Sequence, residues 1–140
     1  MPVPFEYKRA SADFEQFMLD ARDISFLATT HQTYTMVQGV FQAFRRRLDV
    51  RDALLFANVL PPVLRALFVA DWNLDEPHRP FEDRAVMTRE VQSLRPDHNL
   101  APASSIRDVA AALRKNIDQA ELDRVLARLP AGAREYWQAD

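Results

Sequence analysis

The 140-residue chain carries 18 basic and 20 acidic residues, a formal net charge of −2, and 48% hydrophobic residues. This composition is enough for a hydrophobic core and excludes wholesale disorder, and it lacks the basic excess of most nucleic-acid-binding proteins. The absence of cysteine excludes disulfides, thiolate metal sites and a cysteine nucleophile, and the two glycines are too few for a glycine-rich nucleotide-binding loop.

The start of the chain predicts no signal peptide, because no basic segment is followed by an apolar run. The most apolar window, residues 54–72, is interrupted by Asn58, Pro61, Pro62 and Arg65. A membrane span needs about 20 nearly continuous apolar residues, so the sequence predicts none. We therefore expect a cytoplasmic protein that does not enter the membrane.

The first half of the chain has the apolar spacing of amphipathic helices. An early segment covers Ala12–Arg22, and a longer one covers His31–Leu48. In the longer segment, apolar residues recur at the spacing of one helix face: Val37, Val40, Phe41, Phe44 and Leu48. Its last turn contains Arg45, Arg46 and Arg47, where cations oppose the negative end of the helix dipole.

Two Leu-Pro steps divide the helical pattern. Asp49 is suited to cap a third helix that ends near Leu60, and Pro61 and Pro62 then open a short fourth helix. Proline breaks a helix interior but fits its first turn. Pro130 opens a corresponding last segment in the second half.

The second half repeats this plan, starting with a predicted helix over Phe81–Leu94. Further on, Ser105 with Asp108 and Asp118 with Glu121 have the spacing of capping boxes. Each box precedes another amphipathic stretch, so two more helices are expected.

The two halves align without a gap when the chain is offset by 69 residues. The offset pairs residues of the same kind, including Val40 with Val109, Arg45 with Arg114, Asp49 with Asp118, Leu60 with Leu129, Pro61 with Pro130 and Arg65 with Arg134. We expect an all-α fold in a single domain, residues 1–140, whose repeated halves of three to four helices cover approximately 12–72 and 81–137 and form one compact bundle. The aromatic residue after each Leu-Pro, Phe68 or Trp137, is expected to cap the core of its own half.

The repeated motif resembles a bacterial family of small helical proteins known only as a domain of unknown function. The matching residues are Leu60, Pro61, Arg65, Leu67, Phe68 and Trp72 in the first half, and Leu129, Pro130, Arg134 and Trp137 in the second. Val59 and Arg128 depart from the pattern, because a polar glutamine is usual there. The resemblance implies a duplicated helical fold and brings no activity with it.

The linker from Asp71 to Pro80 is the first candidate binding surface. It gathers Asp71, Trp72, His78 and Arg79 between the two halves. Clefts between lobes are common ligand sites, and functional groups concentrate on loops. Trp72 has a second interpretation, as part of the core.

The run Arg45, Arg46 and Arg47 is the second candidate, as a surface for an anion or a nucleic acid. Arg114 and Lys115 have the equivalent place in the second half. The alternative is a structural role, in which these cations complement the helix dipole and pair with nearby acids.

Metal binding and hydrolytic chemistry are weaker alternatives. His78 and His98 lie in two linkers beside acidic residues and are considered as a site of two histidines and one carboxylate, while His31 is isolated. Ser104 and Ser105 are better explained as helix caps than as nucleophiles. The sequence predicts no resident metal or cofactor.

The recurring Arg65 and Arg134 suggest a structural role. On an apolar helix such an arginine pairs with a carboxylate or caps carbonyl groups. We expect Arg65 to pair with Asp49 or Asp52, and Arg134 with Asp118 or Glu121 of its own half.

No coherent catalytic constellation emerges, so the preferred interpretation is a non-catalytic binding or protein-interaction module. Its expected partner is another protein or a second copy of the chain. The alternatives are a metal-dependent or hydrolytic enzyme that uses the linker histidines and acids, and an anion or nucleic-acid binder that uses Arg45–Arg47.

Overall fold

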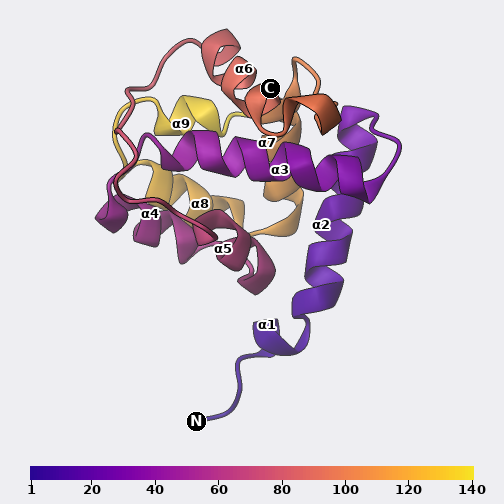
Figure 1. The fold of residues 1–140 in the computed structure, drawn as a ribbon. Helices are drawn as coiled ribbons and strands as arrows, with labels where there is room; N and C mark the ends of the chain where they lie inside the picture. Colours follow the sequence, from indigo (N-terminus) through magenta and orange to yellow (C-terminus); the bar gives the residue numbers. More distant parts are fainter.

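The fold is all-helical, as predicted. The computed structural model describes residues 1–140 and contains no strand (Figure 1). In chain order the helices are α1 (Phe5–Lys8), α2 (Ala10–Ser25), α3 (Thr30–Arg45), α4 (Val50–Ala57), α5 (Pro62–Val69), α6 (Arg84–Ser93), the 3-10 helix η1 (Pro96–His98), α7 (Ser105–Asn116), α8 (Gln119–Leu126) and α9 (Ala133–Tyr136).

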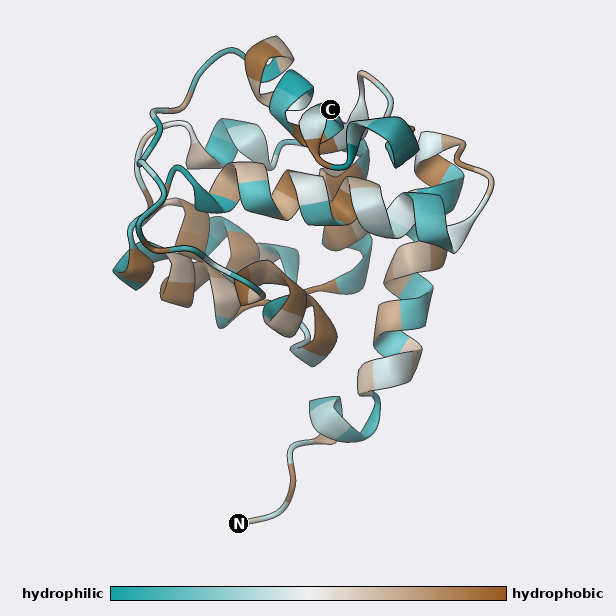
Figure 2. Ribbon diagram, in the orientation of Figure 1, coloured by the Kyte–Doolittle hydropathy of each residue, from teal (hydrophilic) through white to brown (hydrophobic).

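Helices of the first half pack mainly on helices of the second. The most extensive contacts join α2 to α7 and α3 to α6, and α4 also packs on α8. One connected cluster of 31 buried hydrophobic residues runs through both halves. Figure 2 shows the hydrophobic residues concentrated along α4 and α5, which close one side of this core. The halves are therefore interlocked around a shared core.

The sequence predicted that Trp137 caps the core of its own half. The structure instead packs its ring against the first half. The Trp137 ring stacks on Phe56 at 5.3 Å between centroids and meets Phe44 edge-on at 5.4 Å. Both partners belong to the first half, and Trp137 is fully buried. The prediction was wrong because helical periodicity identifies a buried face without identifying the face opposite.

Side-chain caps explain where two helices begin. The Asp49 carboxylate accepts a hydrogen bond from Asp52 N at 2.8 Å, as the sequence predicts. Asp118 likewise accepts from Glu121 N at 3.2 Å. The box predicted at Ser105 is wrong, since Ser105 is a buried helical residue and the preceding serine has the cap position.

The proline steps act as predicted, but the helices before them end earlier. α4 stops at Ala57, and the chain tightens through a hydrogen bond from Leu60 N to Ala57 O before Pro61 and Pro62 open α5. Such i→i+3 bonds are common at helix ends. α3 ends in the same way at Arg45, three residues short of the predicted boundary.

Several features recur at the predicted offset of 69 residues. Residues 50–57 of α4 shifted by 69 coincide with residues 119–126 of α8. Arg45 Nη1 donates to Phe68 O at 2.9 Å, and Arg114 Nε donates to Trp137 O at 2.8 Å. Both donors and both acceptors are related by the same offset.

The amino-terminal segment projects from the bundle (Figure 1). No residue of α1 is buried, and Phe5 and Tyr7 are largely exposed. None of the helices is both long and apolar enough to cross a membrane.

Candidate functional site in the linker pocket

The linker between α5 and α6 is tied across the carboxyl end of α3 by the arginine run. Arg46 Nε donates to Glu76 at 2.5 Å, and Arg47 Nε donates to Pro80 O at 3.0 Å. In the opposite direction, the backbone N–H of Arg79 in the linker donates to Arg46 O at 3.0 Å. The two surfaces that the sequence analysis treated separately are therefore one region.

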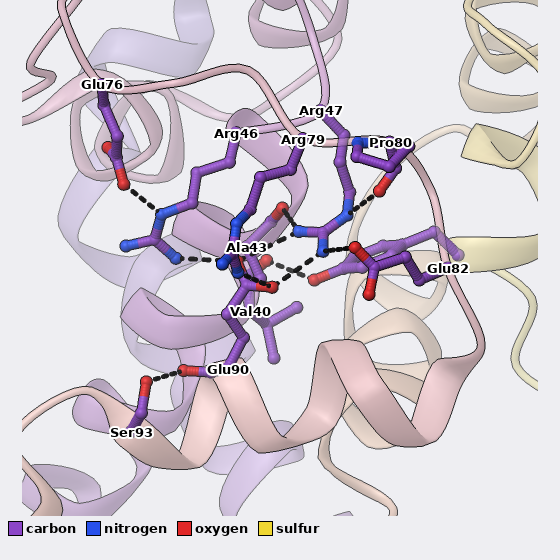
Figure 3. A network of polar contacts seen from close by, with 11 residues as sticks. Val40, Ala43, Arg46, Arg47, Glu76, Arg79, Pro80, Glu82, Glu90 and Ser93 are labelled. Carbon is purple, nitrogen blue, oxygen red and sulfur yellow. Dashed lines mark hydrogen bonds and ion pairs between the residues drawn. The ribbon is translucent and has the colours of Figure 1, made fainter.

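Glu90 of α6 holds this region together (Figure 3). Its carboxylate forms a bidentate pair with Arg47, at 3.1 and 2.7 Å, and also binds Arg46 at 3.1 Å and Arg79 at 3.0 Å. Arg47 is 1% exposed and uses its remaining donors on Ala43 O and Pro80 O. A buried guanidinium whose three nitrogens all donate hydrogen bonds is a structural anchor.

The charges around Glu90 shift its titration. Burial alone would raise its pKa, but the hydrogen bond and charge of Arg47, with the charges of Arg46 and Arg79, hold the pKa below its ordinary value. The pKa of Arg46 is raised, because its bonds to Glu76 and Glu90 outweigh the effect of burial.

Arg45 differs from its two neighbours because no carboxylate pairs with it. Arg46 and Arg47 both form ion pairs, whereas Arg45 donates from Nη1 to Phe68 O and Ala70 O, at 2.9 and 3.0 Å. Its Nε is buried without a partner. Arg45 is 4% exposed, and burial, followed by the nearby Arg46 charge, lowers its pKa.

Arg45 lies beside a cavity of about 210 Å³, which we call the linker pocket. Arg45, Arg46, Leu48, Asp49 and Val50 line it from the α3–α4 side, and Trp72, Leu74, Glu76, Pro77 and His78 line it from the linker. Both acidic groups in this lining are engaged, since Asp49 caps α4 and Glu76 pairs with Arg46.

Trp72 forms one wall of the linker pocket. The ring is half-buried, and the Arg45 guanidinium carbon lies 5.4 Å from its centroid, a cation–π distance. The ring lies close to the guanidinium, while the carbonyls of Phe68 and Ala70 at the end of α5 hold its Nη1. Arg45 is thus held in place before any ligand arrives.

Two of the four linker residues predicted as a binding surface line the pocket, and two do not. Trp72 and His78 line the pocket, whereas Arg79 turns to Glu90 and Asp71 is exposed outside the lining. Asp71 has a left-handed backbone, with φ of 54°, where the chain leaves α5. Of the arginine run, Arg45 and Arg46 reach the pocket.

The run does not form the exposed basic surface considered from the sequence. Arg45 and Arg47 are buried, and only Arg46 is partly accessible. The three side chains extend inward because the end of α5 supplies carbonyl acceptors to Arg45, and the linker and α6 supply carbonyl and carboxylate acceptors to its two neighbours. The equivalent Arg114 is also partly buried, with Asp123 at 3.1 Å.

The histidines do not gather into a metal site. No cluster of three or more histidine and acidic side chains that could hold a metal ion is present, and His31, His78 and His98 are all exposed. The two-histidine, one-carboxylate arrangement considered from the sequence is therefore not found.

The expected ion pairs of Arg65 and Arg134 are also not found. Arg65 instead caps the end of α4, donating to Ala57 O at 3.1 Å and Leu60 O at 2.9 Å, with Glu6 as its nearest acid at 3.6 Å. Of the two contacts expected for Arg65, the capping of carbonyl groups is therefore present and the ion pair with Asp49 or Asp52 is absent. Arg134 is exposed and forms neither contact.

A second cavity of about 210 Å³ lies between α6 and the end of the chain. Its one arginine, Arg84, donates through Nη2 to the carbonyls of Glu135 and Tyr136, at 2.5 and 3.0 Å. The cavity also exposes acidic side chains, including Glu82 and Asp83. It offers no unpartnered cation comparable to Arg45.

Sequence reasoning missed Glu90 and Glu76, although both organise the site. Glu90 lies three residues after the buried Met87 and beside the buried Val91, so an acid close to a core-facing helix side was a readable signal. Glu76 has no local signal, because its partner Arg46 is 30 residues away in sequence.

Comparison with protein families identifies one family over most of the chain. A family model described as an uncharacterized conserved protein (DUF2267) matches residues 14–136. No curated protein matches the chain. The match covers both halves and the whole linker pocket.

Proposed function

The chain belongs to the uncharacterized conserved family DUF2267, and we propose that this member is a non-catalytic binding module whose ligand site is the linker pocket. The observation that carries the proposal is Arg45, a buried cation without a carboxylate partner beside a cavity. Buried charges in folded proteins are ordinarily paired.

The surroundings of Arg45 favour binding over chemistry. The acids of the pocket, Asp49 and Glu76, are engaged in a helix cap and an ion pair. His78 is exposed at the pocket and forms no hydrogen bond with either acid. A general acid or base needs an orienting partner and a defined reach to substrate, and the pocket supplies a fixed cation and an aromatic wall instead.

Native mass spectrometry of the protein freshly purified from its own host tests this proposal. We expect a retained small mass or a stoichiometric partner in the wild type, and its loss in Leu74→Glu, which places a carboxylate at an exposed pocket position. Val69→Glu is the matched control, because Val69 is also exposed but does not line the pocket.

Tryptophan fluorescence of the wild type and of Trp72→Phe provides a second measurement. Trp72 is half-buried at the pocket, whereas the only other tryptophan, Trp137, is fully buried. Trp72→Phe therefore isolates the pocket signal. A clean unliganded mass, together with no Trp72 response to a library of acids, amines and peptides, would overturn the proposal.

A further inference from the structure

We propose that the linker pocket binds a carboxylate carried on an apolar group, with Arg45 as its ionic anchor. This inference rests on the proposed function and names its ligand class. The free edge of the Arg45 guanidinium and the apolar residues beside it are the two features from which the class follows.

The two halves of the chain show what Arg45 lacks. Arg114 stands 69 residues later and makes the equivalent bond to a closing-segment carbonyl, but it also pairs with Asp123 at 3.1 Å. The same offset puts Leu54 in the place of Asp123. The first half therefore has the same arginine and carbonyl partner as the second, but an apolar residue at the position of the carboxylate.

A second position changes in the same direction. Gln119, whose side-chain oxygen lies 3.5 Å from Arg114 Nη1, corresponds to Val50. Val50 lines the linker pocket and is 44% exposed, and Leu54 is 53% exposed. On the opposite wall, Leu74 is also exposed. Val50 and Leu54 are thus apolar at two positions where the other half has polar side chains, and Leu74 adds a third apolar group.

The donors of Arg45 that lack a protein partner suit a carboxylate. Nη1 donates to two carbonyl oxygens, whereas Nε is buried without a partner and Nη2 forms no hydrogen bond. The remaining edge of a guanidinium matches the two oxygens of a carboxylate, and such pairs are stronger than neutral hydrogen bonds. The lining residue Arg46 adds a second positive charge nearby.

The volume sets the size of the ligand group. The pocket, of about 210 Å³, is smaller than the sites of about 300–1,000 Å³ that hold drug-sized ligands, so it suits a small group. This matches a short aliphatic acid or the last residue of a peptide with a free carboxyl end. Both sources present the same chemistry to Arg45.

Calorimetric titration with hexanoate, hexanamide and acetate tests the inference. Hexanoate should bind at least about tenfold more tightly than hexanamide, which lacks the charge, and than acetate, which lacks most of the apolar group. Equal binding of hexanoate and hexanamide would overturn the inference.

Leu54→Asp is the decisive variant, because it copies the arrangement of the second half onto the first. We expect the new carboxylate to pair with Arg45 and to weaken hexanoate binding at least about tenfold, with thermal stability unchanged or raised. Leu54→Asn is the matched control and should bind within about threefold of the wild type. Equal binding by the two variants would contradict the assignment of Arg45.

The peptide arm identifies the source of the carboxylate. A tetrapeptide ending in leucine is compared with its carboxyl-terminal amide and with hexanoate. Tighter binding of the free peptide indicates a protein partner, and tighter binding of hexanoate indicates a small acid. If no acid binds but the wild type retains another mass, the inference fails and the proposed function stands. If neither is observed, both fail.

Discussion

Replacing Glu90 by glutamine tests whether one carboxylate holds the linker, α3 and α6 together. The substitution keeps the size of the side chain and removes its charge, leaving the buried Arg47 with only Glu82, at 3.9 Å, as an ionic neighbour. Breaking a buried pair on one side costs about 3–5 kcal/mol. Because glutamine keeps one acceptor oxygen, we expect the lower end, about 3 kcal/mol.

The expected change in melting temperature follows from chain length. An unfolding entropy of about 2.1 cal/mol/K per residue gives about 0.29 kcal/mol/K for 140 residues. A loss of about 3 kcal/mol then lowers the melting temperature by about 10 °C. Thermal unfolding followed by circular dichroism measures this directly.

The pH dependence separates loss of charge from loss of packing. Because the folded pKa of Glu90 lies below the ordinary value of 4.5, its pairing stabilises the protein above that value and is lost as the pH falls through the folded pKa. The gap between the wild type and Glu90→Gln should therefore narrow in acid.

Glu82→Gln is the control for this prediction. Glu82 is largely exposed and lies 3.9 Å from Arg47, so its loss should cost less than about 0.5 kcal/mol. A Glu90→Gln protein as stable as the wild type at neutral pH, or a gap that does not change with pH, would refute the reasoning.

Three further tests of the packing use chemical denaturation. Gly39→Ala should destabilise by about 1–3 kcal/mol despite better helix propensity, because the new Cβ would lie 2.9 Å from the backbone oxygen of Val91. Tyr136→Phe should cost about 1 kcal/mol, since the buried hydroxyl donates a 2.6 Å hydrogen bond to a carbonyl of α3. Arg65→Ala should cost about 1–2 kcal/mol through two lost carbonyl caps, whereas Arg134→Ala should cost less than about 0.5 kcal/mol; equal effects would contradict the capping role of Arg65.

Local signals predicted the helices well. The apolar spacing identified the helices, Asp49 and Asp118 were recognised as caps, and Pro61 marked a real boundary. These features depend on residues within a few positions of one another. Ser105 failed because two adjacent serines could each cap, and the choice depends on which one the core buries.

Long-range pairing was beyond the reach of periodicity. Trp137 has a helical spacing that predicts burial, but its partners Phe44 and Phe56 come from the other half. For the same reason, the arginine run read as a basic surface until Glu90, 43 residues beyond Arg47, was placed against it. Of the residues that line the linker pocket, the sequence had singled out Trp72 and His78 as linker candidates and Arg45 and Arg46 as part of a separate basic surface.

The most direct measurement of the central claim is a proton–nitrogen NMR correlation of the arginine side chains, with and without hexanoate. Arg45→Lys assigns the Arg45 Nε–H signal. We expect this signal to move on binding, because Arg45 Nε has no partner in the free protein. The Arg47 signal should stay, because Arg47 already donates hydrogen bonds to Pro80 O and Glu90. An unmoved Arg45 signal, or an equal shift of both, would contradict the claim that Arg45 anchors the ligand.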